Sequence, residues 1–147
     1  MNHEPVQLTR FGHDEAWQLG RALVETCRRD GHAVVVSITL GEQRVFHAAM
    51  PGTSADNDGW AERKSRVVRR FARSSLAVYH DLVQHNPAFF EDFALTRGEY
   101  APYGGAVPIV VSGCVVGVLA VSGLESTQDH ELAVAALHVE ATRQQQQ

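Results

Sequence analysis

The stretch YGGAVPIVVSGCVVGVLAVSGLESTQDH, residues 103–130, decides the fold of this chain. It holds two apolar, β-branched runs, residues 105–111 and 115–121, on either side of a Ser-Gly-Cys turn. Such runs with a glycine between them predict a hairpin about Gly113. Because both strands are apolar at most positions, we expect them in the middle of a sheet that is covered on both faces or packed in an oligomer.

Polar residues follow this hairpin and predict the start of a last helix, with Ser126 and Asp129 forming an N-terminal cap. Further elements are predicted upstream from apolar periodicity and from Gly or Pro boundaries. They are a helix from His13 to the stop at Gly31, strands 33–40 and 44–50, a long helix over about 60–83 that Asp58 caps, and a short helix over about 87–95.

The element order α-β-β-α-α-β-β-α predicts an α+β fold, an antiparallel sheet with helices packed on its faces. The length of 147 residues suits a single domain over residues 1–147, with a frayed tail at residues 142–147. Neither cysteine has the spacing of a zinc or redox site. The net charge of -4 argues against nucleic-acid and membrane partners, and the absence of a secretory signal or apolar span predicts a cytoplasmic protein.

Three blocks of the chain carry a resemblance to a known family. They are 34–41 with the return to Met50-Pro51-Gly52-Thr53, Lys64 with residues 71–75, and Gly104-Gly105, Pro108-Ile109, Gly117, 121–123 and Asp129. These blocks resemble the haem-binding or haem-degrading domain family, the GlcG/HbpS-like proteins. The resemblance implies a profilin-like α/β sandwich, a homo-oligomer, and a small-molecule ligand with haem as the candidate cofactor. The loop before Trp60 and the Asp129-His130 ending look like a separate, poorly characterised branch of that family.

Lys64 is the most informative single position. It follows Trp60 by four residues and precedes Val68 and Phe71 by four and seven, so it lies within the apolar stripe of its helix and not on the arginine face. A lysine in such a stripe either extends to water or lines a pocket and holds a carboxylate or phosphate. Both interpretations stay open from the sequence.

The other candidate ligand-binding residues each have a structural alternative. An imidazole such as His47 suits haem iron, but a strand histidine is usually a hydrogen-bonded structural group. Tyr103 suits stacking on a planar ligand or packing on a neighbouring subunit. Asp129 with His130 suits acid–base work, although a carboxylate at a helix N-terminus is also favoured by the helix dipole. The full predicted set is His47, Thr53, Lys64, Tyr103, Asp129 and His130, with no metal site and no assigned catalytic residue.

Three functions remain open at this point. The first is a protein that binds a small ligand, with haem as the candidate. The second is a non-catalytic oligomeric adaptor that uses the arginine face between Arg63 and Arg73. The third is an enzyme acting on a small organic acid, which requires Lys64, His47 and Asp129 to surround one pocket.

Overall fold

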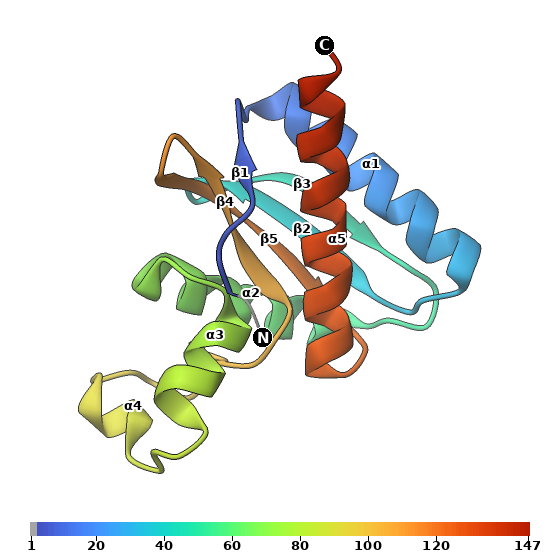
Figure 1. Ribbon diagram of the computed structural model, residues 1–147. Helices are drawn as coiled ribbons and strands as arrows, with labels where there is room; N and C mark the ends of the chain where they lie inside the picture. Colours follow the sequence, from blue (N-terminus) through green and yellow to red (C-terminus); the bar gives the residue numbers. More distant parts are fainter. Residues whose placement is uncertain (1–2) are drawn as a thin grey trace.

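The computed structural model describes residues 3–147 and contains a five-stranded sheet in the order β1-β4-β5-β2-β3, with helices on both faces (Figure 1). The α+β class predicted from the sequence is therefore confirmed. The elements are β1 (Gln7–Leu8), α1 (His13–Asp30), β2 (Val35–Leu40), β3 (Gln43–Ala49), α2 (Ala55–Phe71), α3 (Ser75–Val78), the π-helix η1 (Tyr79–Val83), α4 (Phe89–Asp92), β4 (Ala106–Val111), β5 (Cys114–Ser122) and α5 (Ser126–Gln145).

The two predicted hairpins form the middle of the sheet. Strands β2 and β3 pair antiparallel, β4 and β5 pair antiparallel, and β2 joins the hairpins by pairing antiparallel with β5. The sequence did not predict β1, which adds to β4 in parallel through Gln7 and Leu8. The sheet is therefore mixed at one edge rather than wholly antiparallel.

Helices α1 and α5 lie on one face of the sheet, and α2 lies on the other (Figure 1). The α1–α5 side holds the larger core, built from fully buried residues such as Leu19, Ile38 and Leu119. The α2 side holds a smaller core of mostly small residues, which lets α2 lie close to the strands. This second cluster consists of Ala61, Val68, Ala106, Val118 and Ala120.

The start of α2 differs from the prediction. The helix begins at Ala55, because Ser54 caps it: the Asp56 N–H donates to Ser54 Oγ at 3.3 Å, and the Ser54 N–H donates to Asn57 Oδ1 at 2.9 Å. This reciprocal pair satisfies helix N–H groups five residues before the predicted start. Asp58 is therefore a residue of the first turn and not the cap.

The end of α2 also differs, because the predicted helix over 60–83 is interrupted. Ala72 adopts a left-handed conformation (φ 58°) and ends α2, with its N–H donating to Val68 O. Ser74 then caps α3 by accepting from the Ala77 N–H at 3.1 Å. The apolar stripe continues through this turn, so periodicity alone does not reveal the break.

Three smaller expectations need correction. The helix over 87–95 is only the single turn α4. The cap of α5 is Glu125, which pairs reciprocally with Gln128, and not Ser126 with Asp129. The frayed tail predicted for residues 142–147 is wrong for most of its length, because α5 continues to Gln145 and the buried Gln144 side chain accepts from the N–H and the hydroxyl of Thr9 at 3.0 and 2.9 Å.

Candidate functional site

Lys64 and Asp129 form a buried ion pair where β5 leaves the sheet. Lys64 comes from the inner face of α2 and Asp129 from the first turn of α5, and their side chains are 7% and 1% exposed. The Lys64 Nζ donates to Asp129 Oδ2 at 3.1 Å and to the Val121 carbonyl at 3.4 Å. Asp129 also accepts from the N–H groups of Gly123 at 3.3 Å and Leu124 at 3.0 Å. The pair therefore joins the helices on the two faces of the sheet.

Burial acts against both charges of this pair. It lowers the pKa of Lys64, and the Asp129 carboxylate opposes that effect. It raises the pKa of Asp129, and the Lys64 ammonium with the N–H groups of Leu124 and Gly123 opposes that effect. Because each charge would be costly to bury alone, each depends on the other to remain in place.

Gly105 makes room for this pair at the start of β4. Its φ of 142° lies in a region that side chains disfavour. A β-carbon added there would lie 2.4 Å from the Val121 carbonyl oxygen and 2.8 Å from the Lys64 Nζ. The glycine that the sequence pattern singles out is thus required first by the close approach of the Val121 carbonyl, and the Lys64 ammonium occupies the space beside it.

The ion pair faces a cavity of about 360 Å³, which we call the α2–α5 cavity. Trp60 and Tyr103 supply its aromatic wall, with ring centroids 6.5 Å apart in an edge-to-face arrangement. Both rings are partly exposed, at 36% and 38%. The lining residues are Asp56, Asn57, Trp60, Lys64, Tyr103, Ser122, Gly123, Leu124, Ser126 and Asp129.

Three of the six predicted residues, Lys64, Tyr103 and Asp129, therefore share one cavity. Trp60 also belongs to it, although the sequence places this residue in the apolar stripe of the helix. Its spacing of four residues from Lys64 is the signal that could have assigned it to the same cavity, because positions i and i+4 lie on one helix face.

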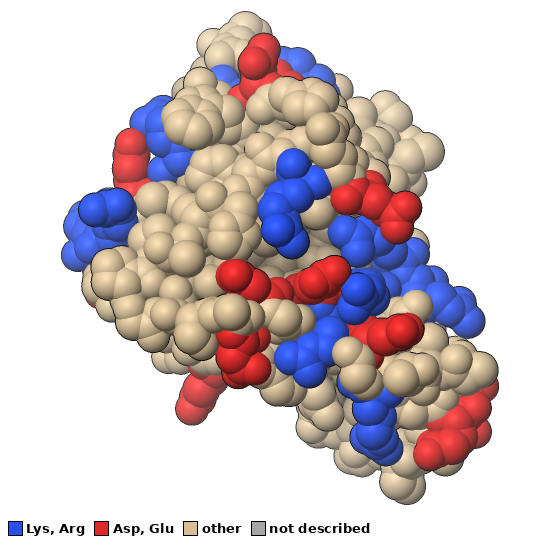
Figure 2. Space-filling model, turned by 180° about the vertical axis from the view of Figure 1, so that it is seen from behind, with Lys and Arg blue, Asp and Glu red and all other residues tan. Residues whose placement is uncertain are grey.

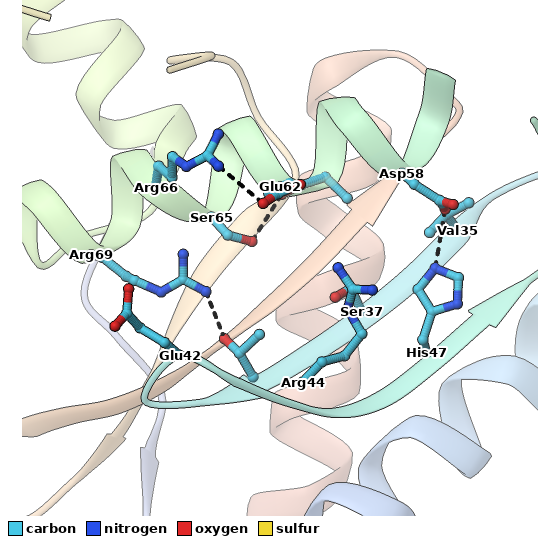
Figure 3. Close-up of a pocket in the computed structure, with 12 residues that line it drawn as sticks. Val35, Ser37, Glu42, Arg44, His47, Asp58, Glu62, Ser65, Arg66 and Arg69 are labelled. Carbon is cyan, nitrogen blue, oxygen red and sulfur yellow. Dashed lines mark hydrogen bonds and ion pairs between the residues drawn. The ribbon is translucent and has the colours of Figure 1, made fainter. Parts of the chain in front are cut away.

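His47 lies elsewhere, in a cleft of about 160 Å³ between α2 and the β2–β3 hairpin (Figure 3). Its Nε2 is 3.0 Å from Asp58 Oδ1 on α2. The cleft does not include Lys64 or Asp129. The condition set for an enzyme acting on a small organic acid, three groups around one pocket, is not met.

His130 lines a third cavity of about 330 Å³ together with His3 and His138. Its Nδ1 is buried and has no hydrogen-bond partner among residues 3–147. Burial, with His3 and His80 nearby, lowers the pKa of His130 to about 4. The imidazole is therefore neutral at physiological pH. His130 and Asp129, which the sequence suggested as an acid–base pair, line different cavities.

Thr53 lines none of these three cavities. Its hydroxyl donates to the Met50 carbonyl at 2.7 Å, which closes the turn between β3 and α2. This bond gives the Thr53 side chain a structural role. In the described part of the chain, no group of three or more His, Cys, Asp or Glu is placed to hold a metal ion, and no helix is long and apolar enough to cross a membrane.

Comparison with known proteins places this fold and sequence in a family. Residues 11–138 match the model of haem-degrading proteins described as HbpS-like. The chain belongs to the HbpS-like family. This HbpS-like chain is also 45% identical over 139 residues to a UPF0303 protein of Streptomyces avermitilis, and the match covers 94% of the chain and 85% of that relative.

Solved structures agree with this assignment at the level of the fold. The crystal structure of the Ybr137w protein has a TM-score of 0.85 and 29% identity to the HbpS-like chain, over 94% of this chain and 82% of that one. The crystal structure of a PduOC–haem complex has a TM-score of 0.75 and 24% identity, over 87% and 93% of the two chains. The resemblance predicted from the sequence blocks is therefore confirmed as family membership.

Proposed function

We propose that this chain binds a small anionic ligand with a planar part in the α2–α5 cavity, and that haem is this ligand. The observation that carries the proposal is that the buried Lys64–Asp129 pair lines the same cavity as the rings of Trp60 and Tyr103. A charged floor beneath two partly exposed aromatic rings combines a stacking surface with a group that recognises carboxylates.

The size and the donors of the cavity support this proposal. A volume of about 360 Å³ falls in the range of roughly 300–1,000 Å³ that is usual for small-molecule sites. An ammonium group has three donors, and Lys64 uses two of them on Asp129 and Val121. The third remains for a carboxylate of the ligand.

The residues around this cavity fit haem in particular. The phenol of Tyr103 is a known type of haem-iron ligand, and the ring of Trp60 offers a face for the porphyrin. Arg63 does not line the cavity, but its guanidinium lies 4.3 Å from the Trp60 ring centroid and adds a positive charge that favours a ligand with propionates. Haem would supply a redox-active iron there, and the HbpS-like family and the PduOC–haem complex supply the precedent.

A haemin titration tests this proposal. We expect a saturable shift of the Soret band with one haemin per chain, weakened about tenfold or more when Tyr103→Phe removes the phenol or Trp60→Leu removes the stacking face. Both residues are partly exposed, so the folded state should persist, and thermal unfolding of each variant checks this.

His47→Ala and His85→Ala are the matched controls, because neither residue lines the α2–α5 cavity. Unchanged binding in both controls supports the site. Binding that responds to His47→Ala and not to Tyr103→Phe would move the ligand to the cleft beside Asp58 and would refute the proposal. An unsaturable shift that no variant changes would mean nonspecific adsorption.

A second candidate function, assembly of identical chains, is favoured by the outer surface of α1 and α5. Val139 is 60% exposed beside a shallow groove of about 90 Å³. An exposed apolar side chain at an apolar groove can pack against its own copy across a two-fold axis, so we infer a homo-oligomer that packs through this face. The groove is lined by Ala22, Leu23, Thr26, Leu132, Ala135, Ala136 and Val139.

The mass of the protein in solution tests this second candidate. We expect a multiple of the chain mass of 16.1 kDa that falls to a smaller species when Val139→Glu introduces a charge into this groove. The control is Glu131→Gln, which changes an exposed position of the same helix and should leave the mass unchanged. Val134→Glu does not serve as a control, because Val134 is partly buried.

A further inference from the structure

Two buried hydroxyl groups lie in the middle of the sheet on the α2 side. Ser37 and Thr39 belong to β2, where the alternate residues Val36 and Ile38 face the main core. Ser37 and Thr39 are only 9% and 7% exposed. Thr39 Oγ1 accepts from Arg69 at 3.2 Å, whereas the Ser37 hydroxyl has no hydrogen-bond partner in the described chain. Both residues line the cleft that contains His47, so the Ser37 hydroxyl is available there to a ligand.

An irregularity in β3 brings an arginine to the same side as these hydroxyls. Ser37 pairs with His47 and Thr39 pairs with Arg44, so β3 uses one extra residue, Val45, between the two pairs. In a regular strand, the side chains of residues three apart point to opposite faces of the sheet. Because of the bulge, the side chains of Arg44 and His47 both lie on the α2 side. Figure 3 shows the Arg44 side chain extending from β3 past Ser37 toward α2.

The charges around this cleft are only partly compensated. Asp58 is 3.0 Å from His47, and Glu62 accepts from Arg66 at 3.0 Å. The guanidinium of Arg44 makes no ion pair or hydrogen bond within residues 3–147.

The guanidinium of Arg69, on the opposite side of the cleft, donates a hydrogen bond to the neutral hydroxyl of Thr39 and makes no ion pair within residues 3–147. The exposed Glu42 is the one lining carboxylate in residues 3–147 that has no ion pair. Two guanidinium groups thus face the same cleft without a carboxylate partner, beside the free Ser37 hydroxyl (Figure 3).

We propose that this cleft is a second site that binds a small oxyanion, a carboxylate or phosphate group, between Arg44, Arg69 and the Ser37 hydroxyl. Guanidinium forks and a hydroxyl are the donors that such oxygens prefer. The volume of about 160 Å³ lies below the usual range for larger ligands and suits a small acid. The cleft shares no lining residue with the α2–α5 cavity, so this site goes beyond the function proposed above.

Calorimetric titration of the purified chain with inorganic phosphate and, separately, with malonate tests the site at constant ionic strength. We expect saturable binding of at least one of the two anions, with one anion per chain. Arg44→Gln and Arg69→Gln should each weaken it about tenfold or more, because each removes a charged hydrogen bond. The tighter of the two anions identifies the group that the cleft prefers.

Two further variants make the test specific. Arg70→Gln removes the same charge from the next position of α2, which stacks on Phe71 and does not line the cleft, and should leave binding unchanged. Glu42→Gln removes a lining negative charge and should tighten binding several-fold. Absent or unsaturable binding of both anions would overturn the proposal, as would equal weakening by Arg70→Gln and Arg44→Gln.

Discussion

Lys64 and Asp129 are 65 residues apart in the chain, and each favours the charged form of the other against the effect of burial on its pKa. Removing one partner of a buried pair usually costs about 3–5 kcal/mol, because the remaining charge is left without compensation. We therefore expect Lys64→Met to lower the free energy of unfolding by about that amount. The double variant Lys64→Met/Asp129→Asn should lose much less than the sum of the two single changes. Urea unfolding of the four proteins measures this coupling, and additive losses would contradict it.

Gly105 gives a second prediction about a single residue. Gly105→Ala places a methyl group 2.4 Å from the Val121 carbonyl oxygen in a backbone conformation that alanine disfavours, and it should cost about 3 kcal/mol or more. Gly113→Ala is the matched control, since Gly113 also has a positive φ (78°) but no atom within 4 Å of the added carbon. It should cost only about 1 kcal/mol. Equal losses in chemical unfolding would show that the contact does not matter.

The sequence predicts the role of an individual residue only where that role depends on the spacing of nearby residues. Lys64 is recognised because it interrupts an apolar stripe, a feature that its neighbours Trp60, Val68 and Phe71 reveal. Its partner Asp129 and the separation of His47 from both depend on how distant segments meet. Ser37 is visible in the sequence as a polar residue inside a valine-rich strand. A bulge in β3 places the Arg44 side chain on the same face of the sheet, and no local sequence pattern shows that bulge.

Among the elements, the junction of α2 and α3 is the place where a substitution should increase stability. Ala72 ends α2 with a φ of 58°, which costs alanine roughly 1 kcal/mol relative to glycine. Ala72→Gly should therefore raise the free energy of unfolding by up to about 1 kcal/mol. Ala135→Gly makes the same chemical change at an exposed position inside α5 and should lower it by about 1 kcal/mol. Thermal unfolding of both variants tests whether the signs are opposite.

The same junction shows why element boundaries were harder to predict than element types. Both hairpins, the start of α1 and its glycine stop have strong local signals, and the structure reproduces them. The break at Ala72 has neither glycine nor proline, and its only local signal is the Ser74 cap that follows. Strand β1 is two residues long, too short for any alternation to appear.

For the whole molecule, the histidines near the N-terminal segment predict a dependence of stability on pH. The ring of His3 lies near His80 and His130, and the pKa of His130 falls from 6.5 to about 4. Because the unfolded chain takes up this proton at a higher pH than the folded one, stability is complete above about pH 6.5 and decreases as the pH falls toward about 4. The loss attributable to His130 is at most about 3 kcal/mol.

Urea unfolding between about pH 7 and about pH 4 measures this loss. His130→Leu removes the titrating group and should flatten the curve in this interval, whereas His85→Ala changes an exposed histidine and should leave the slope intact. A slope that survives His130→Leu would assign the proton uptake to other groups, of which His3 also has a pKa lowered by burial.

The contacts of β1 have a consequence for the order in which the molecule is completed during translation. This strand is made early, but it pairs with β4 about a hundred residues later, and the turn after it is held by the side chain of Gln144. Contacts so distant along the chain form late, because a long loop must close first. The strand nearest the N-terminus can therefore be secured only after the ribosome has made α5, and until then the edge of β4 stays open to other nascent chains.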